Sequence, residues 1–188
     1  TDTPLPPDEP AGENPPDGAM IDYFLAEDSP VTLEIKTKNG ELVRRYSSND
    51  SPVLPNPKKL KIPSYWIRPF AALSSQRGLH RFLWDMHYTP LAGVEPEYPM
   101  SAIYRETPPS PTSPWIVPGE YSVILTAGDR SYTQQLTVKM DPRVKMSEAE
   151  LREQLTLSQQ LSKTRATLEP IGRVFDSLVE QLKKLQEQ

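Results

Sequence analysis

The placement of proline constrains the fold of this chain more than any other feature. The 188 residues include 22 prolines, with six in residues 1–18, five in residues 48–77 and eight in residues 90–118. Proline lacks a backbone N–H and fixes φ, so these three stretches are excluded from helix interiors and central strands. Regular structure is therefore expected only in the windows between them and in the C-terminal quarter.

The windows between the proline-rich stretches alternate between apolar and polar residues, as half-buried strands do. The alternation is clearest at residues 31–36, VTLEIK, and its period of two excludes a helix there. The residues predicted to face a core are Ile21, Tyr23 and Leu25; Val31, Leu33 and Ile35; His80, Phe82, Trp84, Met86 and Tyr88; Tyr121, Val123 and Leu125; and Leu136, Val138 and Met140.

Turn residues divide these windows into hairpins. Asn39-Gly40 predicts a type I′ turn, because both central residues of that turn need positive φ, and residues 41–47 would be the returning strand. Gly128-Asp129 marks a second hairpin. Tyr65-Trp66-Ile67 is expected to anchor the connection 48–77, and residues 100–104 to pair at a sheet edge.

Six or seven strands with no helix between them predict an antiparallel β-sandwich of the immunoglobulin or fibronectin type III kind. The predicted domain organisation is a proline-rich linker at 1–18, the sandwich at 19–142 and a long amphipathic helix at 143–188.

The last segment changes period. Ser147 and Glu150 have the spacing of a capping box, which starts a helix. A heptad seam follows, and its phase continues through Pro170, so one helix kinked at that proline is expected instead of two. This helix seam comprises Leu157, Leu161, Thr164, Leu168, Ile171, Phe175, Leu178, Leu182 and Leu185.

Such a seam needs a partner, because each buried Leu or Phe contributes about 1.5–3 kcal/mol that exposure in water would forfeit. Three partners fit the pattern. They are a helix that follows Gln188 in a longer chain, the same helix of a second molecule, and a neighbouring domain.

Charge and composition exclude several classes of function. The net charge is −4 and basic residues are scattered, which argues against a nucleic-acid partner. No run of 18 apolar residues is present, so no membrane-spanning segment is predicted, and residues 1–18 lack the pattern of a signal peptide. The absence of cysteine excludes disulfides and thiolate zinc sites.

The residue types that carry chemistry do not form a catalytic pattern. His80 and His87 are seven residues apart on one predicted strand and would face opposite sides, so they cannot share a metal there. Asp85, Glu95 and Glu97 are poor candidates for a buried pair of carboxyl groups. No phosphate-binding, dinucleotide-binding or hydrolase motif is present. We predict no catalytic residue, no metal ligand and no cofactor.

Two tryptophans lie in the proline-rich loops. Trp66 and Trp115 could stack on sugar rings, as in carbohydrate-binding modules. Each also has proline and isoleucine nearby, and packing of the loop onto the sandwich is the favoured interpretation.

Three stretches together resemble the FlgD-type immunoglobulin-like domain: VTLEIKTKNGELVRRYSS, GLHRFLWDMHY and PGEYSVILTAGDRSYTQQLTVKMDP. The most specific element is the run Gly-x-His-x-Phe-x-Trp-Asp at residues 78–85. The likeness covers most of residues 14–165. It is greatest to the version found at the C-terminus of bacterial proteins with sortilin-like or BNR-repeat β-propellers, often described as glycosyl hydrolases.

The resemblance implies a bacterial, periplasmic or secreted parent protein whose propeller would hold any hydrolytic site. No Asp-box repeat occurs in this chain, so no catalytic residue carries over. Within the shared run, Trp84 would fill the core between the sheets, Asp85 would bond backbone groups at the end of the strand, and Tyr121 would pack in a corner beside Pro118-Gly119.

Three functions remain as hypotheses. The first and favoured one is a non-catalytic accessory module that docks or assembles through its helix, next to a propeller domain. The second is a carbohydrate- or surface-binding module that uses Trp66 and Trp115. The third is a hydrolase whose acid pair only the fold would reveal.

Overall fold

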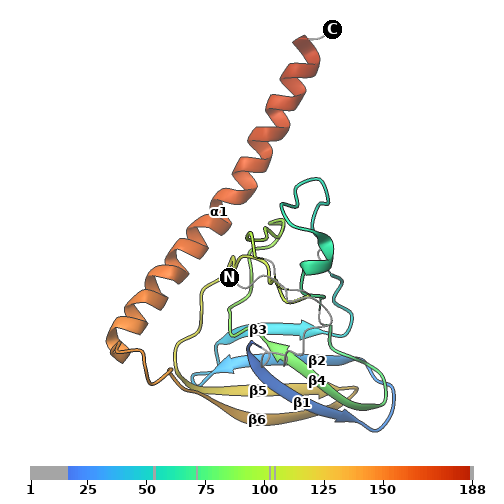
Figure 1. Cartoon of the computed structure of the whole chain (residues 1–188), viewed down its shortest axis with the longest axis vertical. Helices are drawn as coiled ribbons and strands as arrows, with labels where there is room; N and C mark the ends of the chain where they lie inside the picture. Colours follow the sequence, from blue (N-terminus) through green and yellow to red (C-terminus); the bar gives the residue numbers. More distant parts are fainter. Residues whose placement is uncertain (1–16, 53, 71, 102, 104, 187–188) are drawn as a thin grey trace, which may run out of the picture.

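The computed structural model describes residues 17–186 except 53, 71, 102 and 104. It consists of two antiparallel β-sheets followed by one long helix (Figure 1). Residues 1–16 of the predicted linker lie outside the described residues. The elements are β1 (Ala19–Leu25), β2 (Val31–Thr37), β3 (Leu42–Ser47), the 3₁₀ turn η1 (Ser64–Trp66), β4 (Gly78–Trp84), β5 (Gly119–Ala127), β6 (Arg130–Val138) and α1 (Glu148–Gln186).

The sheets are unequal in size. The larger has the order β3-β2-β5-β6 and the smaller consists of β1 and β4, with every pairing antiparallel. In the described residues before α1, which we call the β body (17–146), one core joins both sheets. Its buried residues are Tyr23, Leu25, Val31, Leu33, Ile35, Val43, Leu73, Phe82, Trp84, Tyr121 and Val123.

The predicted strand faces are confirmed where the alternation is clear. Val31, Leu33 and Ile35 are fully buried in β2. The side chains of β5 that were predicted to point inward, Tyr121 and Val123, are buried as well. The sequence alone therefore assigned the inner face of the central strands, because the side-chain period of two leaves one choice of face.

The first hairpin turns differently from the prediction. Gly40 has a φ of 85°, but Asn39 does not have a positive φ, so the type I′ assignment is wrong. The Gly40 N–H donates to the Thr37 carbonyl (2.9 Å) and the Thr37 N–H to the Glu41 carbonyl (2.9 Å). This is the three-residue hairpin loop in which a turn is followed by a left-handed glycine.

The second hairpin has a two-residue loop. Ala127 pairs with Arg130, so Gly128 and Asp129 form the turn. Gly128 has a φ of 56° and Asp129 does not have a positive φ. A glycine at the first central position is the pattern of a type II′ turn, whose twist matches that of the flanking strands.

The aromatic strand is shorter than predicted. Residues 79–88 were expected to be one strand, but β4 ends at Trp84 and the chain turns at Met86, which has a φ of 58°. Phe82 and Trp84 are buried as predicted, whereas His80 is half-buried and Met86 and Tyr88 pack against the core from the loop. The alternation of residue types continued past the end of the sheet because the loop also packs on the core.

The two proline-rich loops are joined to each other. Ile67 and Thr107 form an isolated bridge, in which the Arg68 N–H donates to the Thr107 carbonyl (2.9 Å) and the Thr107 N–H to the Trp66 carbonyl (3.0 Å). Thr107 is fully buried. The loop 48–77 is thus held at its middle, as predicted, but by backbone hydrogen bonds. The Tyr65 side chain of the expected anchor is exposed.

Two further apolar residues of the loop 48–77 are buried. Leu73 belongs to the core that joins the sheets and Ile62 is buried elsewhere, and the sequence had not marked either of them. The edge strand expected at 100–104 is not found at Met100, Ser101 or Ile103, and residues 102 and 104 lie outside the described part.

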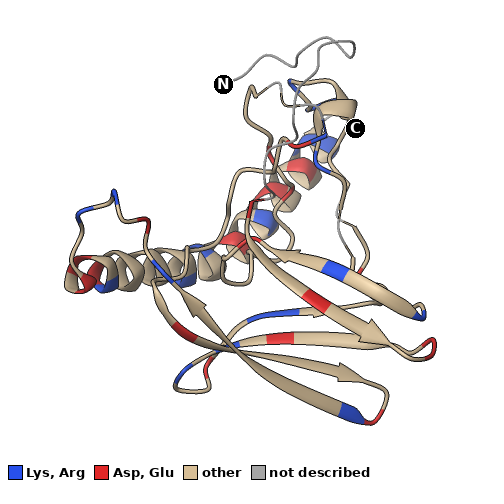
Figure 2. Ribbon diagram, turned by 60° about the horizontal axis from the view of Figure 1, so that its bottom comes forward, with Lys and Arg blue, Asp and Glu red and all other residues tan. Residues whose placement is uncertain are grey.

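The C-terminal segment is one helix of 39 residues, about 58 Å long at 1.5 Å per residue. The capping box is confirmed: the Ser147 N–H donates to the Glu150 carboxylate (2.7 Å), and the Glu150 N–H donates to Ser147 Oγ (3.3 Å). Pro170 lies inside the helix. The ribbon changes direction partway along α1 (Figures 1 and 2), as expected of a helix that contains a proline.

Candidate functional site

The two histidines have structural partners. His87 is buried because the chain turns at Met86, and its Nδ1 donates to the Asp85 carbonyl (2.8 Å). His80 Nε2 lies 2.6 Å from the Gln76 carbonyl. The prediction that both lie on one strand is wrong, since β4 ends before His87. In the described residues, no three His, Asp or Glu side chains gather closely enough to hold a metal ion.

The carboxylates singled out from the sequence are also in structural contacts. Asp85 Oδ1 accepts the N–H of His87 (3.2 Å), as expected for a residue at the end of the strand. Glu95 pairs with Lys59 (2.6 Å). Glu97 is exposed and its backbone carbonyl accepts the Ser110 N–H (2.7 Å).

The carboxyl pKa values that are shifted all move downward. Hydrogen bonds from Arg81 lower the pKa of Asp22, hydrogen bonds from Arg143 lower that of Asp141, and the capping box lowers that of Glu150. A general acid needs the opposite shift, which burial produces. These three shifts are therefore opposite in direction to the one that a general acid needs.

The loop tryptophans differ in exposure. Trp66 is half-buried and makes an edge-to-face contact with Tyr65 at 5.9 Å between ring centroids. Trp115 is 58% exposed, although the centroid of its ring lies 3.9 Å from the centroid of the His87 ring. The expected packing of the loops onto the body is thus partial at both positions, and Trp115 keeps an accessible aromatic surface.

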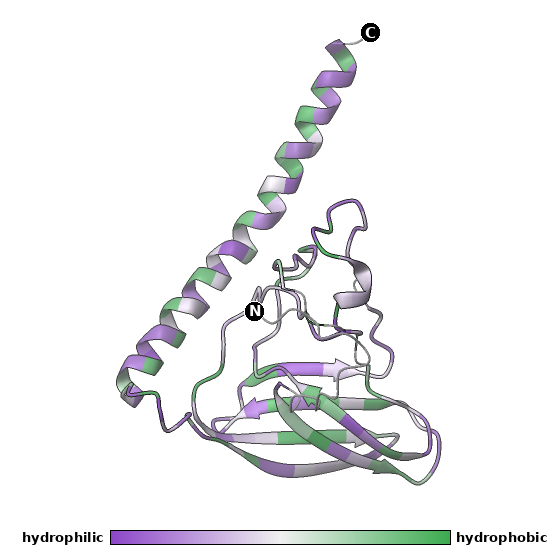
Figure 3. Ribbon diagram, viewed as in Figure 1, coloured by the Kyte–Doolittle hydropathy of each residue, from purple (hydrophilic) through white to green (hydrophobic). Residues whose placement is uncertain are grey.

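The apolar seam of α1 is exposed. The helix contains no buried residue. The apolar residues of the helix seam are more than half exposed, from 53% for Leu178 to 67% for Leu185. Figure 3 shows apolar segments recurring along the helix to its C-terminal end.

The β body touches the helix on a different face from the seam. Arg173 donates to the Ala92 carbonyl (3.2 Å) beside Gly93, and Gln159 is hydrogen-bonded to Tyr88. With 3.6 residues per turn, residues 159 and 173 lie across the helix from the seam positions Leu161 and Phe175. The helix therefore presents its seam away from the β body.

The positions that flank the seam carry little charge. In a coiled coil the residues beside the core set partner choice through ion pairs. Glu153 and Arg165 are the charged residues among them in the described helix, and the rest are neutral. These flanking residues are Leu151, Glu153, Ser158, Gln160, Arg165, Thr167, Gly172, Val174, Val179, Gln181 and Gln186.

Charge elsewhere on the molecule is mixed. Figure 2 shows basic and acidic segments interspersed over the strands and the helix. No helix among the described residues has both the length and the apolar content needed to cross a lipid bilayer.

No protein-family model matches the chain, and neither a curated protein nor a solved structure does.

Proposed function

We propose that this chain is a non-catalytic accessory module that assembles with a second copy of itself through the seam of α1. The observation that carries the proposal is the orientation of the helix: its apolar seam is exposed along its length and faces away from the β body. A lone helix in water gains nothing from such a seam, whereas pairing would bury it.

Self-pairing is supported by the flanking positions. In a parallel coiled coil of two helices, the residue before every second core position lies close to the residue five places later in the partner helix. In this seam those core positions include Leu161 and Phe175. In this helix that places Gln160 near Arg165 and Val174 near Val179 of the second copy. Because no such pair combines like charges, the helix has no electrostatic barrier to its own copy.

The test is the mass of the 188-residue chain in solution, measured by sedimentation equilibrium over a range of concentrations. We expect a dimer, twice 21.3 kDa, and a monomer for the double variant Leu168→Glu, Phe175→Glu. The control is Ala166→Glu, which adds one carboxylate on the side of the helix opposite the seam and should leave the dimer intact; it is compared with the single variant Leu168→Glu, which adds the same charge in the seam and should weaken the dimer.

A wild-type chain that stays monomeric with α1 fully helical would contradict the proposal. A helix that pairs only when a longer chain or a neighbouring domain is present would contradict self-assembly and favour one of the other two partners.

The immunoglobulin-like assignment of the β body is part of this proposal. In that fold one sheet has the order G-F-C-C′, and strands B and E are neighbours in the other. The order β6-β5-β2-β3 corresponds to G-F-C-C′, and the pair β1-β4 corresponds to strands B and E. The Tyr121 hydroxyl donates to the Val117 carbonyl (2.6 Å), which fits the tyrosine corner near the start of strand F. The buried Trp84 is a departure, because it lies on β4 and not on the strand that corresponds to C.

The parent protein is proposed from the resemblance of residues 78–85 and the flanking strands to FlgD-type modules of bacterial propeller proteins. It would be exported to the periplasm or secreted, and a neighbouring propeller would carry any hydrolytic activity. The coding sequence on both sides of this segment tests the idea: a β-propeller upstream would support it, and an unrelated domain there would exclude it.

A second function, carbohydrate binding, is favoured by the exposed indole of Trp115. Aromatic rings that stand out of a loop can stack on sugars. Binding of the chain to a glycan array should then be lost in Trp115→Ala and kept in Phe70→Ala, which removes another exposed aromatic ring. Binding that both variants retain would exclude Trp115 as the contact.

A further inference from the structure

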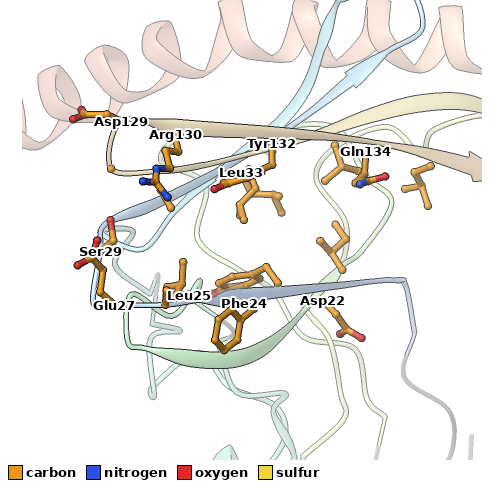
Figure 4. Close-up of a pocket in the computed structure, with 18 of the residues that line it drawn as sticks. Asp22, Phe24, Leu25, Glu27, Ser29, Leu33, Asp129, Arg130, Tyr132 and Gln134 are labelled. Carbon is orange, nitrogen blue, oxygen red and sulfur yellow. The ribbon is translucent and has the colours of Figure 1, made fainter.

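Two features of the molecule take no part in the proposed function. One is a groove of about 800 Å³ between β1 and β6 (Figure 4), where β6 contributes Tyr132 and Gln134 and β1 contributes Leu25. Its hairpin end is lined by charged side chains, and nothing among the described residues shows what covers it. The other feature is the strap, residues 139–147, which joins β6 to α1 (Figure 1).

The strap contains an Asp-Pro bond, between Asp141 and Pro142. No other Asp in the 188 residues precedes a proline. Such a bond is labile in acid for two chemical reasons. The Asp carboxyl group can attack its own main-chain carbonyl carbon through a five-membered ring, and proline leaves from a tertiary amide as a secondary amine.

A turn in the strap holds both reacting groups. The Val144 N–H donates to the Asp141 carbonyl oxygen (2.9 Å), which belongs to the bond that would break. The Arg143 N–H donates to Asp141 Oδ1 (2.9 Å), and the Arg143 guanidinium binds both carboxylate oxygens. Asp and Pro are ordinary residues for the first two positions of a turn. The same contacts polarise the carbonyl and keep the carboxylate beside the Asp141–Pro142 bond.

The bond is open to water and lies between two separately built regions. Residues 141–147 are all exposed. Every buried residue of the core precedes the strap, and α1 begins after it at Glu148. Breaking the Asp141–Pro142 bond would therefore remove no core residue from the sheets and no residue from the helix.

We propose that the Asp141–Pro142 bond is a self-cleavage site at which acid separates α1 from the strands of the β body. A carboxyl oxygen of Asp141 forms a bond to its own main-chain carbonyl carbon, the carboxyl proton passes to the Pro142 nitrogen, and the C–N bond breaks. The products are a cyclic anhydride at Asp141 and the free amine of Pro142. One water molecule then opens the anhydride, which leaves the chains 1–141 and 142–188.

Arg143 sets the acidity that this step needs. The reacting form of Asp141 carries one proton, which ends on the Pro142 nitrogen. Hydrogen bonds from the side chain of Arg143, and then from its backbone, lower the pKa of Asp141. The proton is therefore bound only in stronger acid than at an unpaired Asp. The other charged side chain described at this turn is Lys145, whose Nζ donates to the Pro142 carbonyl (3.3 Å).

The consequence of cleavage rests on the proposed function. If the seam of α1 pairs two copies, cleavage leaves the helices paired and frees each set of sheets as a monomer. The strap would then be stable at neutral pH, and an acidic surrounding would end the assembly irreversibly.

The test is incubation of the folded 188-residue chain at pH 3, 4, 5 and 7, followed by intact-mass measurement. We expect the masses of 1–141 and 142–188 to appear in acid and not at pH 7. The rate should not depend on protein concentration, because the step is intramolecular. Circular dichroism of the same samples shows whether the chain is folded while the bond breaks.

Two variants remove the reacting groups one at a time. Asp141→Asn lacks the nucleophile and Pro142→Ala lacks the leaving group, so each should abolish both products. Both residues are exposed, so both variants should fold.

Arg143→Ala should move the profile of rate against pH to higher pH, because the unpaired carboxyl group binds its proton earlier. The matched control is Lys139→Ala, which removes an exposed cation of the same strap that is not bound to the carboxylate, and its profile should equal that of the wild type.

Four results would overturn the proposal: no products in acid, products that persist in Asp141→Asn or Pro142→Ala, cleavage that begins only once the sheets have unfolded, and an unchanged profile in Arg143→Ala. Sedimentation before incubation keeps the proposed function separate. A chain that is monomeric at the start contradicts pairing alone, and a dimer that yields no products contradicts cleavage alone.

Discussion

The β body and α1 both carry apolar residues at regular spacing, yet they use them differently. In β2 the apolar face is covered by the smaller sheet, and Val31, Leu33 and Ile35 are fully buried. In α1 the apolar seam is covered by nothing in the described structure. A regular apolar pattern thus shows that a face exists to be buried, but the partner that buries it can lie in the same chain or outside it.

The same difference predicts how the two regions unfold. The β body has a core that joins strands distant in sequence, and such cores unfold cooperatively. The helix has a capping box, few contacts to the β body and an internal proline, so its stability is local unless it is paired. Substitutions in one region should therefore leave the other largely unchanged.

The largest expected effect is that of Trp84→Ala in the β body. Trp84 is fully buried, and its Nε1 donates to the His87 carbonyl (3.2 Å). The substitution should cost about 3–5 kcal/mol through the cavity it leaves. Urea denaturation followed by circular dichroism checks it, with Trp115→Ala as a control of much smaller effect. An unchanged midpoint would show that Trp84 does not support the core.

Pro170→Ala should act on the helix alone and in the stabilising direction. Proline inside a helix costs about 3 kcal/mol relative to alanine, and its removal restores a backbone donor and relieves the bend. The helix signal at 222 nm should persist to higher temperature, while the β-body transition stays where it is. A shift of both transitions together would show that the two regions are more tightly coupled than their contacts indicate.

Tyr121→Phe should cost about 1–3 kcal/mol, since it leaves the Val117 carbonyl without its donor. Burial, with a smaller contribution from Tyr88, raises the pKa of Tyr121 from 10.0 to about 12. The unfolded chain therefore loses the Tyr121 proton at a lower pH than the folded chain does. The contribution of protonated Tyr121 to the free energy of unfolding is fully present below pH 10 and falls as the pH rises from 10 to 12.

The pH dependence can be read from urea midpoints at pH 9, 10, 11 and 12. The wild type should lose stability over that range, and Tyr121→Phe should lose less. Burial also raises the pKa of Tyr46, with a further contribution from the charge of Asp85, so a remaining slope is expected in the variant. Equal slopes in both proteins would mean that Tyr121 ionises as it does in water.

The smallest expected effect is that of Ser147→Ala at the start of α1. The variant removes the hydroxyl that accepts the Glu150 N–H. The backbone N–H of Ser147, and to a smaller extent its hydroxyl, donate to the Glu150 carboxylate and lower the pKa of that group. Because that pKa is depressed, the contribution of the cap is present above pH 4.5 and is lost as the pH falls below it. Amide exchange of residues 148–151 should be faster in the variant at pH 7, and the difference should shrink in acid.

Local residue patterns were enough for much of the fold. The faces of β2 and β5, the helix start at Ser147 and the single helix through Pro170 all follow from periods and caps that act within a few residues. The site residues behave differently. His87 was assigned to a strand face, but a positive φ at Met86 turned it into the core, and nothing in the local pattern marks that turn.

The groove was missed for a related reason. Tyr132 and Gln134 are in phase with Leu136, and their polarity is a signal that this half of the β6 face is not fully buried. The sequence showed which side of β6 faces inward but not that the smaller sheet has only two described strands. The count of strands opposite β6 depends on pairing between distant segments.

By itself, the sequence determined the identity and direction of the apolar faces, the positions of the hairpins and the length of the helix, because these depend on backbone sterics and side-chain period over short distances. Only the tertiary structure decided where each strand pairs, which loop residues reach the core, that the seam of α1 faces away from the β body, and that a groove remains between β1 and β6. These features depend on contacts between residues far apart in the chain, where hydrophobic burial is non-directional and many arrangements satisfy the same local pattern.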